Sequence, residues 1–188
     1  MRSRITLLTA ILSIGAAAIA LAIPALPRKS PEFSIVEPTP DGKDGKTTLL
    51  SSYRGKVVVL AFIHTTCPHC QAFCQELTKL HGELGPKGFQ PLAVAWDNPG
   101  ANLRVHAFVK DLKLDFPVGS VPAYDPVMNF LGFSVMERPV VPLVAVIDKK
   151  GMLRAQSPPQ GDANLQDENS LRALIMSLLN EPASAAKK

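Results

Sequence analysis

The segment of this sequence that could carry chemistry is Cys67-Pro68-His69-Cys70, in which two residues separate two cysteines. It follows Val57–Ile63, an apolar, β-branched run typical of a buried strand. Helices accept proline in their first turn, so the motif is expected to open a helix. There the two sulfurs can bond to each other, and the helix dipole stabilises a thiolate on Cys67. The spacing therefore predicts a redox pair, with Cys67 as nucleophile and Cys70 as resolving thiol.

All three cysteines of the 188-residue chain lie close together, at positions 67, 70 and 74. A disulfide scaffold would spread its cysteines along the chain, and a Cys67–Cys70 bond closes so small a loop that it adds only ~2 kcal/mol. The clustering therefore indicates chemistry. Cys74 follows Cys70 by one helical turn and is expected on the same helix face as a small buried residue. A third redox thiol or a metal ligand is the alternative for Cys74.

The four histidines and one acid are further candidates for the site. His69, inside the motif, and His64, at the end of the preceding strand, are candidates for tuning the thiols. His81 and His106 are expected to be surface residues on helices. Asp97 follows an apolar strand, at the kind of strand end where sites of α/β folds gather, but one acid there is weak evidence.

Size and charge favour one ordinary globular domain with an additional N-terminal segment. The composition is 46% hydrophobic and 19% charged, and the formal net charge is +4. Four of the positive charges belong to Arg2, Arg4, Lys187 and Lys188 at the two ends, which leaves the body near neutral. The charge therefore does not indicate nucleic-acid binding.

The N-terminus, residues 1–27, is expected to be a signal peptide or a membrane anchor. The positive start Met1–Arg4 precedes the uncharged apolar run Ile5–Ile23, which is close to the length that spans a bilayer. Ala20-Leu21-Ala22 offers a small-x-small cleavage pattern, and no cysteine follows that could carry a lipid anchor. Cleaved or anchored, the remainder of the chain is predicted to be periplasmic or otherwise extracytoplasmic.

The body of the chain, residues 28–181, alternates apolar runs with amphipathic stretches, which predicts a layered α/β domain. Residues 182–188 are expected to form a flexible tail. A helix is expected from the cysteine motif to about Leu84, where Gly85-Pro86 would end it. The other expected strands are Phe33–Val36, Val57–Ile63, Pro91–Trp96, Phe116–Val118, Leu143–Ile147 and Met152–Gln156, and the other expected helices are Asn102–Leu112, Asp125–Phe130 and Asn169–Leu179.

The chain also resembles a known family. Gly42-Lys43, Gly45-Lys46 and the stretch Leu50–Phe62, running into the cysteine motif, are similar to the TlpA/ResA-type branch of the thioredoxin-like proteins, relatives of the AhpC/TSA superfamily. The resemblance extends from about Glu32 to Leu179. It implies a thioredoxin-like fold, a central mixed sheet flanked by helices on both faces. It also implies an exported disulfide oxidoreductase with protein thiol or disulfide substrates, a membrane thiol electron donor and no cofactor.

The resemblance assigns a docking role to Val141 and Pro142. In this family a cis-proline lies against the CxxC motif, and the residue before it docks the substrate backbone. Pro142, which precedes an apolar strand, matches the cis-proline, and Val141 takes the docking position. From the residues alone, Pro142 is only a strand-initial proline.

Three positions depart from the family pattern. Thr66 stands where the branch often has tryptophan before the first cysteine. Phe73 stands where ResA-like members often have glutamate, and Ala61 where many thioredoxins have a buried acid. Without those acids, His64, His69 or solvent would have to accept the proton of the resolving thiol.

The direction of electron flow is left open by these residues. The Pro68-His69 dipeptide resembles that of the oxidant DsbA, whereas the scaffold resembles a branch of reductases. The reductase direction is favoured on the scaffold.

Other chemistries fit the motif less well. Attachment of c-type haem needs histidine directly after the second cysteine, where Gln71 stands. A peroxiredoxin would need threonine and proline at the positions of His64 and Leu60. One contiguous helix rarely wraps a tetrahedral zinc ion, so no metal site is predicted.

A Sco-like copper metallochaperone is the alternative function, because thiolate and imidazole suit copper. That family uses CxxxC and a distant downstream histidine. Cys70 and Cys74 have the spacing but lie far along the helix, and no histidine follows His106.

Overall fold

The structure is a computed structural model that describes residues 24–97, 100–134 and 136–182. The expected signal peptide or anchor, with its apolar run and cleavage pattern, falls almost entirely within residues 1–23 and so lies outside the described residues. Most of the expected tail, 183–188, lies outside them too. Within the described ranges, no helix combines the length and apolar character needed to cross a membrane.

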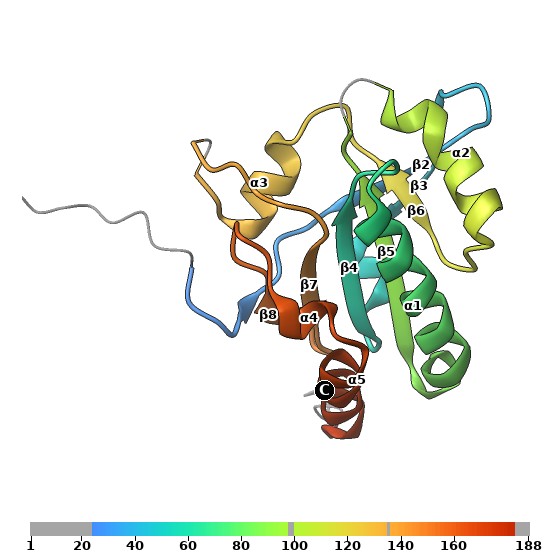
Figure 1. Cartoon of the computed structure of the whole chain (residues 1–188). Helices are drawn as coiled ribbons and strands as arrows, with labels where there is room; N and C mark the ends of the chain where they lie inside the picture. Colours follow the sequence, from blue (N-terminus) through green and yellow to red (C-terminus); the bar gives the residue numbers. More distant parts are fainter. Residues whose placement is uncertain (1–23, 98–99, 135, 183–188) are drawn as a thin grey trace, which may run out of the picture.

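A mixed sheet of six strands forms the centre of the domain (Figure 1). Its middle strand β4 (Val57–Ile63) pairs in parallel with β5 (Phe89–Ala95) and antiparallel with β7 (Leu143–Ile147). The parallel side continues to β6 (Val118–Ser120). The antiparallel side continues from β7 to β8 (Met152–Gln156) and the edge strand β1 (Arg28–Lys29).

Strand β4 is buried on both faces, as its uninterrupted apolar sequence predicts. Because successive side chains of a strand point to opposite faces, β4 contributes to two separate cores. Val57, Val59, Ala61 and Ile63 pack into the first core, and Val58, Leu60 and Phe62 into the second.

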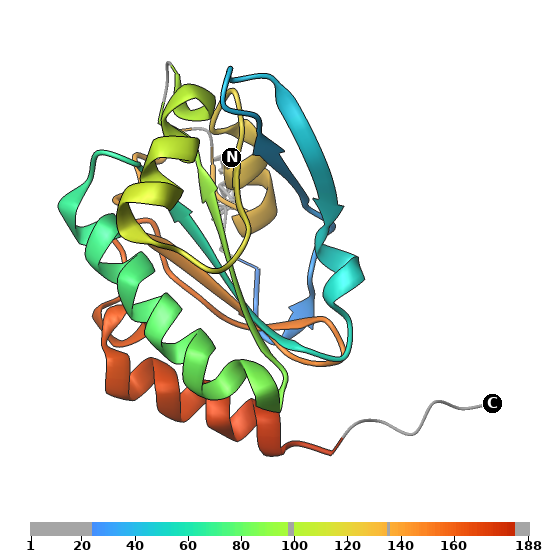
Figure 2. The same ribbon diagram turned by 90° about the vertical axis from the view of Figure 1, so that its right-hand side faces the viewer.

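Helices cover both faces of the sheet, which confirms the predicted architecture. The first core packs against α1 (Pro68–Leu84), α2 (Ala101–Leu112) and α5 (Glu168–Asn180). The second core lies under α3 (Asp125–Leu131) and the hairpin of β2 (Ser34–Pro38) and β3 (Asp44–Leu49). Figure 2 shows α1 and α5 on one side of the sheet and the hairpin on the other. The remaining short elements are the 3₁₀ turns Leu50–Tyr53 and Gly85–Lys87 and the helix α4 (Ala163–Gln166).

Some element boundaries differ from the sequence expectations. Helix α1 ends at Leu84 as predicted, and its cap is Gly85. Strand β6 begins at Val118, whereas the prediction was Phe116–Val118. Strand β3 was not predicted, because its residues are mostly exposed and lack an apolar alternation; it pairs only with β2.

Candidate redox site

Cys67 lies where strand β4 gives way to helix α1. It is the N-cap residue of α1 and Pro68 occupies the first turn, as the sequence predicts. The Cys67 carbonyl accepts the first helical hydrogen bond from the Gln71 amide at 3.0 Å, and the Cys67 amide donates to the His64 carbonyl at 3.2 Å. The Cys67 side chain is half-buried, so its thiol can meet another molecule.

Cys70 lies in the next part of the turn and is fully buried in the first core. Burial raises the pKa of the Cys70 thiol, the His64 amide lowers it through a hydrogen bond to Sγ, and the Cys67 side chain, hydrogen-bonded to Cys70, raises it further. The net effect is a pKa far above the ordinary value, so Cys70 stays protonated at neutral pH. The two thiols therefore differ sharply in their access to solvent.

Cys74 is fully buried in the same core, one turn further along α1. Burial raises its pKa to about 12. All three cysteines are free thiols in this structure. The burial agrees with the expected place of Cys74 on the inner helix face; whether it has a redox role stays a prediction.

The surroundings of Cys70 are apolar. Ala61 and Phe73, the positions where relatives often carry acids, both belong to the first core with Cys70. Neither can accept a proton from the resolving thiol. The acceptor must therefore come from the polar groups at the mouth of the site or from solvent.

The two candidate tuning histidines lie in different surroundings. His69 is exposed in the first turn of α1. The His64 ring packs against Trp96, with 5.4 Å between ring centroids, and Trp96 belongs to the second core. The His64 contact with Cys70 runs through its backbone amide at 3.5 Å. Of the other histidines, His81 pairs with Asp115 at 3.1 Å and His106 is exposed.

The loop before β7 holds the predicted docking residues. The Val141–Pro142 peptide bond is cis, which confirms the conformation implied by the resemblance. Pro142 is buried, and its carbonyl accepts a hydrogen bond from Gln166 Nε2 at 3.2 Å. Val141 is half-buried and packs against both cores. Substrate docking by these two residues stays a prediction.

A polar network beside the motif joins Asp97 to Thr65 and Arg104. Asp97 Oδ1 accepts from the Thr65 amide at 3.0 Å, and Oδ2 accepts from the Thr65 hydroxyl and from Arg104 Nη2 at 3.0 Å. Burial tends to raise the pKa of Asp97, but the hydrogen bonds from Thr65 and Arg104 outweigh it and hold that pKa below its ordinary value. The sequence singled out Asp97 only by its place at a strand end and missed Thr65 and Arg104.

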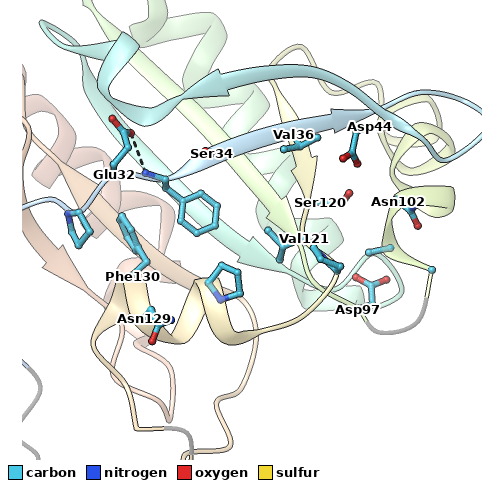
Figure 3. Close-up of a pocket in the computed structure, with 16 residues that line it drawn as sticks. Glu32, Ser34, Val36, Asp44, Asp97, Asn102, Ser120, Val121, Asn129 and Phe130 are labelled. Atoms are coloured by element: carbon cyan, nitrogen blue, oxygen red, sulfur yellow. Dashed lines mark hydrogen bonds between the residues drawn. The ribbon is translucent and has the colours of Figure 1, made fainter.

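Asp97 also lines a cavity of about 750 Å³. Figure 3 shows Asp97, Asn102, Ser120 and Asp44 gathered at one end and Phe130 with Asn129 at the other. Three carboxylates line it, and none of its lining residues is basic. Its remaining lining residues are Pro31, Glu32, Phe33, Ser34, Val36, Gly100, Ala101, Val121, Pro122 and Pro126.

Metal ligation finds little support in the geometry. In the part of the chain that the structure describes, no three His, Cys, Asp or Glu side chains come together as metal ligands would. Cys70 and Cys74, the CxxxC pair of the copper alternative, are both fully buried in an apolar core.

Comparison with known proteins shows that residues 27–156 match the AhpC/TSA family. A protein of Xenopus laevis named "probable glutathione peroxidase 8-B" is 37% identical over 82 residues, 40% of this chain and 39% of that protein. The thiol-disulfide oxidoreductase ResA of Geobacillus thermodenitrificans is 30% identical over 111 residues, 59% of each. The matches thus span about two fifths and three fifths of these relatives.

Solved structures share the fold. A thiol:disulfide interchange protein of the thioredoxin family from Chlorobium tepidum has a TM-score of 0.64 at 22% identity, covering 84% of this chain and 99% of that one. A secreted thiol-disulfide isomerase from Corynebacterium glutamicum has a TM-score of 0.64 at 20% identity, covering 80% and 85%. The fold is therefore thioredoxin-like, as the sequence predicted.

Proposed function

The chain belongs to the AhpC/TSA family, and from that premise we propose that it is a thiol–disulfide oxidoreductase working on protein substrates through Cys67 and Cys70. One observation carries the proposal: Cys67 is accessible at the N-terminus of α1, whereas Cys70, within hydrogen-bonding reach of it, is fully buried. An attacking thiolate must reach its substrate, and a resolving thiol needs to reach only its neighbour. The similarity to ResA supports the same chemistry.

The reaction proceeds in two exchanges. The Cys67 thiolate attacks one sulfur of a substrate disulfide, and the other substrate sulfur leaves as a thiolate. Cys70 then loses its proton and attacks the Cys67 sulfur, which releases the second substrate sulfur. Two electrons have passed to the substrate, and a Cys67–Cys70 disulfide remains for an external thiol donor to reduce. The donor proposed here is a membrane thiol protein.

We infer the reductase direction from the scaffold, which resembles a branch of reductases, and from the similarity to ResA. The Cys67–Cys70 potential of the full-length chain, equilibrated against glutathione and dithiothreitol, tests this direction. A value near about −270 mV supports a reductase, and one near about −120 mV would mean that the protein donates disulfides.

The proposed location is outside the cytoplasm, with residues 5–23 as signal or anchor. The uncharged run after Arg2 and Arg4 supports it. A reporter active only in the periplasm, fused after Lys188, is expected to give signal. Activity of a cytoplasm-only reporter at the same junction would contradict the location.

Peroxide reduction is a second candidate, because the match to glutathione peroxidase 8-B has the higher identity of the two relatives. An accessible Cys67 thiolate could take one oxygen from a peroxide as a sulfenic acid, which Cys70 would resolve to the disulfide with loss of water. His64 and Leu60 at the positions that peroxiredoxins fill with threonine and proline argue against it. Turnover of hydrogen peroxide is expected to be much slower than turnover of insulin disulfides, and the reverse order would favour the peroxidase.

A copper carrier remains the alternative function, and a Cu(I) titration of the reduced protein distinguishes it from the oxidoreductase. The buried positions of Cys70 and Cys74 leave Cys67 as the accessible sulfur ligand of the motif. The reduced protein is therefore expected to hold Cu(I) weakly against a competing chelator. Stoichiometric, tight copper binding with little disulfide turnover would favour the carrier.

A further inference from the structure

Thr65, two residues before Cys67, is held at each of its polar groups. Its amide donates to Asp97 Oδ1 at 3.0 Å and its hydroxyl to Asp97 Oδ2. Its carbonyl accepts from Gln71 Nε2 at 2.9 Å. The side chain is buried as well. Thr65 is thus fixed from two directions, by the end of β5 through Asp97 and by α1 through Gln71.

The sheet brings Thr65 and Asp97 together. Strands β4 and β5 run in parallel with Ile63 opposite Ala95. Thr65 and Asp97 each follow by two residues, so both strands deliver them to the same edge. The register of β4 with β5 therefore sets the contact and ties the residues before Cys67 to the end of β5.

Asp97 is itself locked in place. It is 9% exposed, and Arg104 donates to its Oδ2 from Nε at 3.2 Å and from Nη2 at 3.0 Å. Arg104 Nε also lies 3.2 Å from the Thr65 hydroxyl oxygen. A carboxylate with charge-assisted partners on one oxygen and a backbone amide on the other resists rotation.

We propose that Asp97 is a positioning residue that acts through Thr65 to hold Cys67 against Cys70. Cys70 is fixed inside α1, whereas Cys67 is an N-cap residue outside the regular helix. The freedom of the segment before α1 therefore determines the effective concentration of one thiol at the other. The role in turnover rests on the proposed function, but the positioning of the pair can be measured without any protein substrate.

Asp97→Asn in the full-length chain tests the proposal. Asparagine can still accept the Thr65 amide with its oxygen, but its NH₂ group cannot accept the Thr65 hydroxyl or Arg104. The equilibrium measured is disulfide plus two glutathiones against dithiol plus glutathione disulfide, with two electrons passing from glutathione. The variant is expected to shift at least fivefold toward the dithiol, because the loosened segment makes ring closure less favourable.

A matched control is Asp111→Asn, the same chemical change at an exposed acid on α2. It is expected to leave the equilibrium constant within twofold of wild type. Thr65→Val removes the hydroxyl and keeps the backbone amide, so it is expected to shift the equilibrium at least twofold toward the dithiol. If Asp97 acts through Thr65, the double variant shifts less than the product of the single shifts.

The outcomes separate the two proposals. An Asp97→Asn variant that melts at a lower temperature but keeps the wild-type equilibrium constant would overturn the positioning role. Should that variant not fold, Thr65→Val decides, and a wild-type constant there overturns the role equally. A wild-type protein that forms the Cys67–Cys70 disulfide but reduces no protein disulfide would remove the proposed function and leave this test intact.

Discussion

The backbone amide of His64 points at the sulfur of Cys70 across 3.5 Å. His64 directly follows β4, and Cys70 lies inside the first turns of α1, so the contact ties strand to helix at the motif. An amide is a fixed donor that stabilises a developing thiolate without titrating itself. Burial nevertheless dominates, and it keeps the pKa of Cys70 raised. The His64 amide therefore stabilises the Cys70 thiolate that forms when Cys70 loses its proton and attacks.

Alkylation should distinguish the three thiols by access. We expect iodoacetamide at pH 8 to label the reduced native protein once, at Cys67, because Cys70 and Cys74 are fully buried with raised pKa values. Mass spectrometry counts the adducts. The same protein in guanidinium chloride should take three labels, which controls for reagent and time. Two rapid adducts on the native protein would contradict the assigned order of access.

Single cysteine variants should separate attack from resolution. Cys67→Ser is expected to lower insulin reduction at least a hundredfold, because the nucleophile is gone. Cys70→Ser is expected to accumulate mixed disulfides through Cys67, visible as higher bands on non-reducing gels that vanish with dithiothreitol. Cys74→Ser is the control and should keep most of the activity. A loss as complete as that of Cys67→Ser would instead give Cys74 a redox role.

The fold was predictable wherever one local pattern decided it. The uniform apolar, β-branched run Val57–Ile63 is typical of a buried strand, and Gly85-Pro86 marked the end of α1. Strand β3 was missed because its side chains face solvent on a two-stranded hairpin, so burial imposed no pattern on them.

The sequence predicted only those site residues that lie in one continuous segment of the chain. Cys67 and Cys70 belong to a single motif. Thr65 and Asp97 instead follow two different strands and meet through the register of β4 with β5, and Arg104 joins them from α2. A sequence shows which strands exist but not which residue stands opposite which. The network therefore required the structure.

Two glycines should respond oppositely to alanine. A Cβ at Gly119 on β6 would lie 2.8 Å from Ile35 Cγ2 and 3.0 Å from the backbone of Val36, so Gly119→Ala is expected to destabilise by ~1–3 kcal/mol. Gly82 lies exposed within α1 with nothing within 4 Å of a Cβ, so Gly82→Ala is expected to stabilise by ~1 kcal/mol. Urea unfolding of the two variants measures both. Wild-type stability of Gly119→Ala would show that the hairpin does not approach β6 as closely as the structure has it.

Alkaline pH should lower the free energy of unfolding of the reduced protein, because the Cys74 thiol ionises more readily in the unfolded chain. Burial raises the pKa of Cys74 from 9.0 to about 12. A thiol whose pKa is higher in the folded than in the unfolded state contributes stability fully below pH 9 and loses it as the pH rises toward 12.

The test is Cys74→Ala, which removes that titration at the cost of a small cavity. At pH 7 the variant is expected to be less stable than wild type by ~1 kcal/mol, because a buried sulfur is lost. Because lysines and tyrosines titrate equally in both proteins, the gap in free energy of unfolding should shrink above pH 9 and reverse its sign by about pH 11, where wild type has lost on the order of 2 kcal/mol. Urea unfolding with dithiothreitol present measures the gap at each pH. A gap that stays constant over this range would mean that Cys74 gains no protection from ionisation on folding.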